Sequence, residues 1–226
     1  MASGWCETRV EIDKVEATGE ALKPLYVSMG RTVAEYPHLD AWTLDKLVTA
    51  LGKTEGFMDK LEALAVRYPH LLEYIHVKLW FRCIPRFVAD QLARHRLASW
   101  MMTSVRHGRL DLPLPDLLKK VRPGYWRVVV DWYRLSRGKA LELIDKGVPV
   151  EVAARILPPV YAVDLYYAGN LRELLHILWA RLQRDVQLET RVVAAMAARA
   201  LVGHSPSLRA IVLNWFRVYR AWGWPG

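Results

Sequence analysis

The densest cluster of polar side chains lies between residues 91 and 109, in the run QLARHRLASWMMTSVRHGR. Its guanidinium groups stand beside Ser and Thr hydroxyls, a combination that supplies positive charge and directional donors for a phosphate or another anion. A basic helix end would have the same composition, because Arg and His near a helix C-terminus satisfy the last carbonyls and the helix dipole. Composition alone leaves both interpretations open.

The elements around this cluster must position it. Residues 73–83 alternate between apolar and polar side chains, which predicts a strand with one buried face. Pro85 suits the first position of a helix, which we predict to run to about His95. Such a helix would place Gln91 and Arg94 on one face together with His95.

Most of the remaining chain is predicted to be helical. We expect a strand at 8–15, a strand-like or irregular segment at 159–168, a loop at 108–122, and helices at 20–37, 41–67, 123–146, 149–156, 171–203 and 206–221. Asn170 suits the N-cap of the longest helix, on which Arg172 and His176 share a flank. The predicted apolar stripe of that helix consists of Leu171, Leu175, Leu178 and Leu182. Many helices with few strands indicate the α+β fold class.

The composition bounds the function classes. The chain has 226 residues, of which 32 are Lys or Arg and 23 are Asp or Glu, so the formal charge is +9. This charge favours anionic partners, which include nucleic acid, acidic lipid and phosphorylated small molecules. A hydrophobic share of 53% excludes wholesale disorder. Two Asn and three Gln accompany 10 Trp and 10 Tyr, a composition that fits a thermophile.

Compartment and metal content follow from the termini and the cysteines. No apolar run is long enough for a membrane span, and residues 1–14 lack the apolar core of a signal peptide. Cys6 and Cys83 have no neighbours at metal-binding spacing, so no metal site is predicted. We expect reduced thiols in a cytoplasmic protein, with Cys6 near a mobile terminus and Cys83 in the core.

Two ordered motifs carry a family resemblance. Arg94-His95-Arg96, seven further residues and Ser104 match the RHR-x7-S signature of flavin-dependent thymidylate synthases. A second block follows the order of that family: Gly147-Val148-Pro149, Leu157-Pro158, Asn170-Leu171-Arg172, His176, Arg181 and Gln187-x-Glu189. The chain therefore resembles this family over roughly residues 70–192, whereas residues 1–60 and the C-terminal helix resemble it little.

The resemblance implies a helix-rich subunit with a small antiparallel sheet, one domain over residues 1–226, and a homotetramer with sites at subunit interfaces. Such enzymes bind FAD, oxidise NADPH and transfer a methylene group from methylenetetrahydrofolate to dUMP, which gives dTMP. By motif, the FAD contacts would be Arg94, His95, Arg96, Asn170, Arg172 and His176. The dUMP contacts would be Gln91, Ser104, Arg106 and Arg181. Arg181 and Ser104 are the predicted catalytic residues, with Ser104 as a hydrogen-bond donor, since this chemistry needs no protein nucleophile.

Departures from the family pattern leave the activity open. Met101 and Met102 stand where the family has an amide and a carboxylate, and Ala154 stands where it has an Arg. Two outcomes remain: a divergent synthase, or a paralogue that keeps the fold and has altered or lost synthase activity. A third alternative is a nucleic-acid-binding protein that uses the basic run at 119–139. The lack of a recognised reading motif argues against that alternative.

Overall fold

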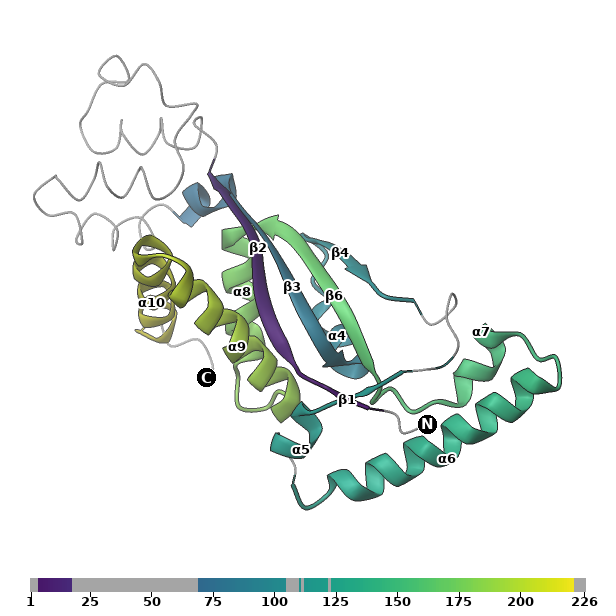
Figure 1. Ribbon diagram of the computed structural model, residues 1–226. Helices are drawn as coiled ribbons and strands as arrows, with labels where there is room; N and C mark the ends of the chain where they lie inside the picture. Colours follow the sequence, from purple (N-terminus) through teal and green to yellow (C-terminus); the bar gives the residue numbers. More distant parts are fainter. Residues whose placement is uncertain (1–3, 18–68, 105–109, 111, 122, 222–226) are drawn as a thin grey trace, which may run out of the picture.

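The computed structural model describes residues 4–17, 69–104, 110, 112–121 and 123–221 (Figure 1). The predicted helices at 20–37 and 41–67 and the predicted substrate contact Arg106 lie outside the described residues. The described part is rich in helices and contains a small antiparallel sheet, so the predicted α+β fold class is confirmed.

The central sheet has four antiparallel strands in the order β2-β3-β6-β4. These strands are β2 (Arg9–Ala17), β3 (Ile75–Pro85), β6 (Ala162–Asn170) and β4 (Ser99–Met102). Apolar side chains of β3 such as Leu79 and Phe81 are buried, whereas Lys78 and Trp80 point to the other face. The predicted strands at 8–15 and 73–83 are confirmed, and the ambiguous segment at 159–168 is a strand. Edge strand β4 was not predicted.

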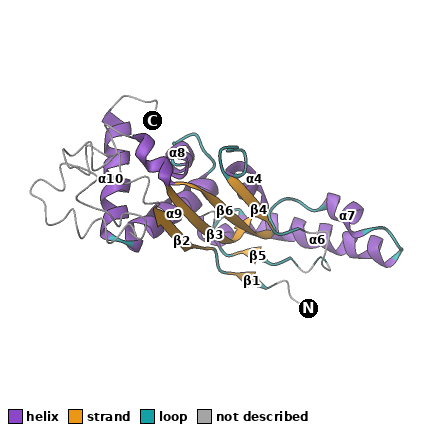
Figure 2. Cartoon of the chain, turned by 90° about the horizontal axis from the view of Figure 1, so that it is seen from above, coloured by secondary structure: helices purple, strands orange, loops and turns teal. Residues whose placement is uncertain are grey.

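Helices cover the apolar face of the sheet. Helices α4 (Arg86–Leu92) and α8 (Leu171–Arg181) lie on the same side of it in both views (Figures 1 and 2). Helix α9 (Leu188–His204) packs against β2 and α8, and α10 (Pro206–Ala221) packs against α9. The predicted helix at 206–221 is confirmed. The helix from Pro85 ends at Leu92, before Arg94 and His95, because the chain turns there.

The predicted helix at 171–203 is wrong as a single element. It divides into α8 and α9, and residues 182–187 form the turn between them. Apolar periodicity continues through this region, but the Gln183 side chain donates to the Trp179 carbonyl oxygen (2.9 Å) at the end of α8. The break matters for the site, because it allows Gln187 to meet Gln91.

Helices α6 (Trp126–Asp145) and α7 (Val150–Ala153), with a 3-10 turn at Ala154–Ile156, form an arm beside one end of the sheet (Figure 1). They confirm the predicted helices at 123–146 and 149–156. Gly147 ends α6 with a φ of 87°, a left-handed conformation that favours glycine. The predicted loop at 108–122 contains β5 (Leu114–Pro115), which pairs in parallel with β1 (Trp5–Cys6), and the short helix α5 (Leu117–Val121).

The two cysteines form a disulfide, which corrects the expectation of reduced thiols. Cys6 and Cys83 are 77 residues apart in sequence, and their Cα atoms lie 6.0 Å apart. Cys83 is buried, as predicted, but Cys6 belongs to strand β1 instead of a loose terminus. The pairing depends on the β1–β5 contact, which no local pattern in the sequence reveals. None of the helices in the described ranges is long and apolar enough to cross a membrane.

Candidate functional site

A cavity of about 590 Å³ lies at the N-terminal end of α8. Asn170, Arg172 and His176 line it, and all three are predicted cofactor contacts. The remaining lining residues are Glu73, Leu97, Glu173, Trp215 and Tyr219. The structure therefore brings together three predicted residues from one motif block and adds side chains from elements that precede and follow it.

The sequence of α8 explains why these polar residues face the cavity. Its apolar residues Leu171, Leu174, Leu175, Ile177 and Leu178 are buried, so the opposite flank carries the polar groups. Asn170 caps the helix, since its Oδ1 accepts a hydrogen bond from Glu173 N (2.8 Å). The predicted cap and the predicted apolar stripe are therefore confirmed, although Leu182 lies just beyond the helix end.

Gly169 leaves room for the start of α8. The Tyr167 hydroxyl donates to the Asn170 carbonyl oxygen (2.9 Å) and passes close to Gly169. A Cβ atom at position 169 would lie 2.5 Å from that hydroxyl oxygen. A side chain here would push Tyr167 away, so glycine is required for the contact that holds the cap residue.

The guanidinium group of Arg181 interacts electrostatically with Arg94 and with the ring of His95, which interacts in turn with His176, and His176 lines the cavity. We call these four side chains the cationic cluster, whose fixed charge comes from the two arginines. The rings of His95 and His176 lie 6.1 Å apart, and His95 Nδ1 lies 3.9 Å from Glu173 Oε1. The pKa of His95 is lowered to about 4, chiefly by burial and in addition by the nearby charges of Arg181 and His176. His95 is consequently neutral at pH 7, and its contact with Glu173 is not an ion pair.

Arg181 and Glu173 are also perturbed by burial. Burial lowers the pKa of Arg181, and the charge of Arg94 acts in the same direction, which indicates that two guanidinium groups share this region. Burial raises the pKa of Glu173, while His176 and Arg172 oppose that rise. Perturbed groups of this kind concentrate at functional sites.

Three buried nitrogen atoms, one in the cavity lining and two in the cationic cluster, have no hydrogen-bond partner among the described residues: Trp215 Nε1, His95 Nε2 and Arg181 Nε. Buried polar atoms without a partner are rare in folded proteins. Together with the cations and the cavity, they provide a site that an anionic, hydrogen-bonding ligand would complete. Trp215 and its neighbour Tyr219 come from α10, and no sequence pattern indicated that this helix would reach the site.

The predicted contacts also differ in their partners and exposure. Arg172 pairs with Glu73, and Arg96 is exposed. The Gln91 side chain donates to Gln187 Oε1 and accepts from Thr190 Oγ1 (3.2 Å). Two motif amides are therefore in direct contact, although they are far apart in sequence.

Ser104 lies at the other end of the sheet from this cavity. It follows Thr103, whose backbone N–H donates to the Asp164 carbonyl oxygen (3.0 Å). Asp164 and Asn170 stand near opposite ends of β6. At 3.3 Å per residue the distance between them is about 20 Å. One subunit therefore does not bring Ser104 to the cavity residue Asn170.

The basic run at 119–139 makes mostly local contacts. Lys119 lies over the Trp5 ring (3.6 Å), and Lys120 pairs with Asp116 (2.6 Å). Farther along, Arg137 Nε donates to the Leu110 carbonyl oxygen, Arg134 lies 3.7 Å from Asp131, and Lys139 pairs with Glu142. Arg122 lies outside the described residues. In the described part of this run, Lys120, Arg134 and Lys139 pair with nearby carboxylates and the other contacts are also local, which weakens the nucleic-acid alternative.

Comparisons with known proteins agree with this architecture. A family model described as "Thymidylate synthase complementing protein" matches residues 23–207. A flavin-dependent thymidylate synthase of Geobacter sulfurreducens is 26% identical over 178 residues, which are 73% of this chain and 73% of the relative. One from Thermococcus onnurineus is 27% identical over 192 residues, which are 80% of this chain and 75% of the relative. One from Pyrococcus furiosus is 32% identical over 153 residues, which are 62% and 61% of the two chains.

A solved structure is similar over almost the whole chain. The crystal structure of the UMP/dUMP methylase PolB from Streptomyces cacaoi, bound with 5-Br dUMP, aligns with a TM-score of 0.67. The alignment covers 92% of this chain and 96% of that one at 20% identity. At this identity the likeness establishes a shared fold.

Proposed function

Because the chain belongs to the family of thymidylate synthase complementing proteins, we propose that it is a flavin-dependent thymidylate synthase. It would convert dUMP to dTMP with methylenetetrahydrofolate and NADPH, using FAD. The observation that carries this proposal is the cationic cluster beside the α8 cavity, with buried nitrogen atoms that lack partners within the described residues. We further propose that residues 1–226 act as one domain and that the enzyme works in the cytoplasm.

The residues at the cavity fit FAD as a ligand. The pyrophosphate of FAD is an anion, and guanidinium groups bind phosphates with charge and directional donors. Arg172, His176 and Asn170 line the cavity, and Arg94, His95 and Arg96 belong to the same proposed site. When bound, FAD supplies hydride transfer. The protein would supply binding and orientation, and the neutral His95 ring would offer Nε2 as a partner without adding charge.

We place the dUMP site between subunits. Gln91 and Arg181 would contribute from one subunit, and Ser104 and Arg106 from another. The support is geometric, because Ser104 follows a segment held about 20 Å from Asn170 along β6. The flavin and dUMP must be in contact to exchange a hydride. A single subunit would hold the flavin near Asn170 and dUMP near Ser104, too far apart for this contact.

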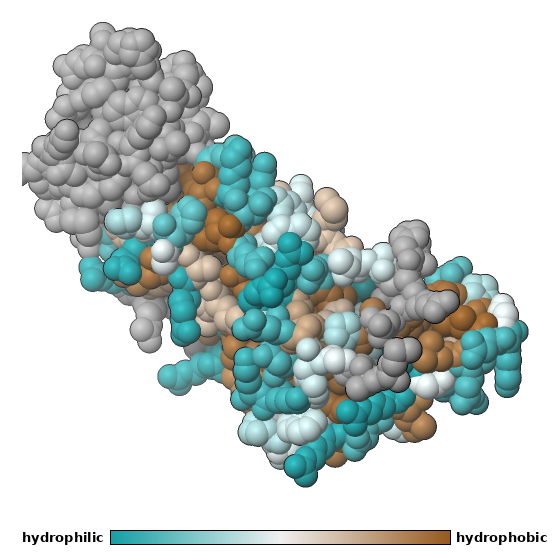
Figure 3. Space-filling model, viewed as in Figure 1, coloured by the Kyte–Doolittle hydropathy of each residue, from teal (hydrophilic) through white to brown (hydrophobic). Residues whose placement is uncertain are grey.

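The homotetramer in this proposal needs an apolar contact surface, and α6 offers one. Val128, Trp132 and Leu135 are exposed at helical spacing on α6. Figure 3 shows hydrophobic residues among hydrophilic ones on the arm that contains α6 and α7. Exposed apolar stripes of this kind mark association surfaces.

The α6 stripe can be tested with a matched pair of variants. Leu135→Glu should reduce the mass measured by light scattering, because it introduces a charge into the proposed contact. Arg134→Glu places a carboxylate one residue away, outside the stripe, and should leave the assembly intact although its change of charge is larger. Equal masses for both variants would remove α6 from the proposed interface.

A second candidate function is the paralogue with altered or lost synthase activity. The observation that favours it is Met101, which is 68% exposed on β4 at a position where the family resemblance implies a polar residue. Met102 has the opposite orientation and is partly buried against the core. A thioether cannot replace an amide or a carboxylate as a strong hydrogen-bonding partner of a nucleotide.

One experiment separates the two functions. The purified protein is first tested for a flavin absorbance spectrum, and then for release of tritium from C5 of dUMP in the presence of NADPH and methylenetetrahydrofolate. Flavin with tritium release supports the synthase, whereas flavin without release supports the paralogue. A protein that binds no flavin after incubation with FAD contradicts both.

A further inference from the structure

Strand β3 contains a bulge opposite a single residue of β6. Phe81 pairs with Leu165 and Ile84 pairs with Val163, so Arg82 and Cys83 together face Asp164. Cys83 has a φ of 50°, a conformation that residues other than glycine rarely adopt. Bulges and strained residues of this kind often lie next to functional sites, where they redirect side chains or end strand pairing.

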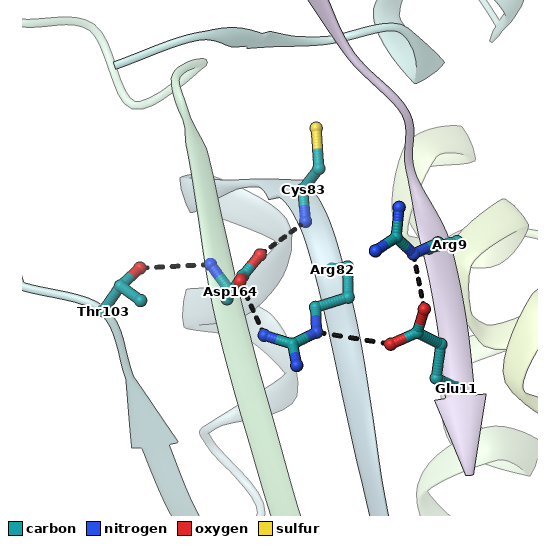
Figure 4. A network of polar contacts seen from close by, with 6 residues as sticks. All are labelled: Arg9, Glu11, Arg82, Cys83, Thr103 and Asp164. Carbon is teal, nitrogen blue, oxygen red and sulfur yellow. Dashed lines mark hydrogen bonds and ion pairs between the residues drawn. The ribbon is translucent and has the colours of Figure 1, made fainter. Parts of the chain in front are cut away.

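The Asp164 carboxylate binds both residues of the bulge, through the backbone of Cys83 and the side chain of Arg82. Cys83 N donates to Oδ1 (2.8 Å), and Arg82 Nη1 donates to Oδ2 (2.9 Å) (Figure 4). Thr8 Oγ1 donates to the Cys83 carbonyl oxygen (2.8 Å) in a buried contact. The backbone of Cys83 is therefore satisfied by side chains instead of by a neighbouring strand.

The backbone of Asp164 fixes the end of β4. Asp164 N donates to Thr103 Oγ1 (3.1 Å), and its carbonyl oxygen accepts from Thr103 N (3.0 Å). Strand β4 is an edge strand whose neighbour in the sheet is β6, and its last pair is Met102 with Leu165. The bonds from Asp164 to Thr103 extend this pairing to the residue that directly precedes Ser104.

We propose that Asp164 is a positioning residue that holds Ser104 in the place required for nucleotide binding. The proposal rests on the proposed function, in which Ser104 contacts dUMP. Asp164 does not itself touch the nucleotide; its carboxylate fixes the bulge of β3 on one side, and its backbone fixes Thr103 on the other. One residue thus connects the interior of the sheet with the segment that carries Ser104.

Loss of the Asp164 carboxylate should affect both the bulge of β3 and the end of β4. The Cys83 N–H would lose its acceptor, and a buried donor without a partner is costly, so the local strand pairing would shift. A shift of β6 at residue 164 moves Thr103, because one backbone–backbone hydrogen bond and one bond to the Thr103 hydroxyl join the two residues. Loss of a hydrogen bond to a charged ligand group lowers affinity about ten-fold or more, so an effect of that size on nucleotide binding is expected when Ser104 is displaced.

The first test measures the segment itself and needs no substrate. Hydrogen–deuterium exchange followed by mass spectrometry would compare the wild-type protein with Asp164→Ala, Asp164→Asn and the control Glu16→Gln. Glu16 forms ion pairs at the opposite end of the same sheet. We expect faster exchange of the peptide containing Ser99–Thr103 in Asp164→Ala, partial recovery in Asp164→Asn, and wild-type exchange in Glu16→Gln. Unchanged exchange in Asp164→Ala would overturn the inference.

The second test separates positioning from general stability. Calorimetry with dUMP should show affinity reduced ten-fold or more in Asp164→Ala and less in Asp164→Asn, with flavin content and kcat changed little. Equal loss of flavin and dUMP would indicate damage to the whole fold and overturn the inference. If the wild-type protein binds no dUMP, the proposed function fails, while the exchange experiment still decides whether Asp164 holds the β4 end.

Discussion

At its Asn170 end, strand β6 leads into a cavity beside a cationic cluster, whereas at Asp164 it joins a network in which Arg9 and Arg82 both contact carboxylates. In the cluster, burial lowers the pKa values of His95 and Arg181, and the nearby guanidinium groups of Arg181 and Arg94, respectively, act in the same direction. Such an arrangement costs stability, and proteins keep it where a ligand of opposite charge compensates. The charge-balanced network needs no ligand, and we assign it a role in holding backbone. The following predictions test this contrast.

The largest expected effect is at the cationic end. Arg181→Ala should lower dUMP-dependent turnover by about 100-fold, since it removes a preorganised donor and charge from the site. Arg181→Lys should recover part of the activity, because it keeps the charge and loses the planar fork. Steady-state kinetics on each variant provides the measurement. Exposed Arg184→Ala is the matched control and should behave like the wild type. A similar loss in both variants would show that the site is not specific to Arg181.

The next effect concerns the charge-balanced network at the Asp164 end of β6. Cys83→Ser should lower the free energy of unfolding by about 2–4 kcal/mol, because the disulfide closes a long loop in the unfolded chain. Denaturant unfolding with and without a reducing agent would measure this. Cys6→Ser should give a similar loss, and a reducing agent should destabilise the wild type but neither variant. Flavin content should stay unchanged. Loss of flavin in either variant would show that the two ends are not independent.

A smaller effect follows from the pKa of His95, which is about 4 in the folded protein and about 6.5 in an unfolded chain. The unfolded state then binds more protons, so stability should fall as the pH is lowered from about 6.5 to about 4. The loss should be about 1–2 kcal/mol after allowance for partial exposure. Denaturant unfolding at several pH values measures it. His95→Gln should remove this part of the pH dependence, which separates it from Glu173, whose raised pKa acts in the opposite direction. An identical pH profile in both proteins would contradict the assignment.

These contrasts show which features the sequence could reveal. Local periodicity correctly predicted β2, β3, the cap at Asn170 and the polar flank with Arg172 and His176, because each depends on near neighbours in the chain. It failed at the break between α8 and α9, since apolar spacing continues through residues 182–187 while the backbone turns.

Long-range contacts could not be predicted from the sequence, because they join residues that are far apart in the chain. The disulfide requires Cys6 and Cys83 to meet across 77 residues, and Trp215 reaches the cavity only through the packing of α10. The bulge at Cys83 is also hidden, because the alternation of β3 stops at Cys83 and the apolar residues that follow do not distinguish a bulge from the end of a strand. Family motifs grouped Asn170, Arg172 and His176, which line one cavity, but they gave no indication of the bonds between Asp164 and the segment before Ser104.

The smallest expected effect distinguishes two carboxylates of the same network. Glu11 pairs with Arg9 and Arg82 at the surface, and exposed pairs of this kind contribute about 0–1 kcal/mol. Asp164, in contrast, accepts the backbone N–H of Cys83 and replaces a bond of the sheet. Glu11→Gln should therefore leave thermal stability and the exchange of residues 99–103 close to wild type, although it removes a charge from Arg82. If Glu11→Gln increases the exchange of that segment as much as Asp164→Ala does, then the ion pairing of Arg82 positions the segment and the bulge does not contribute.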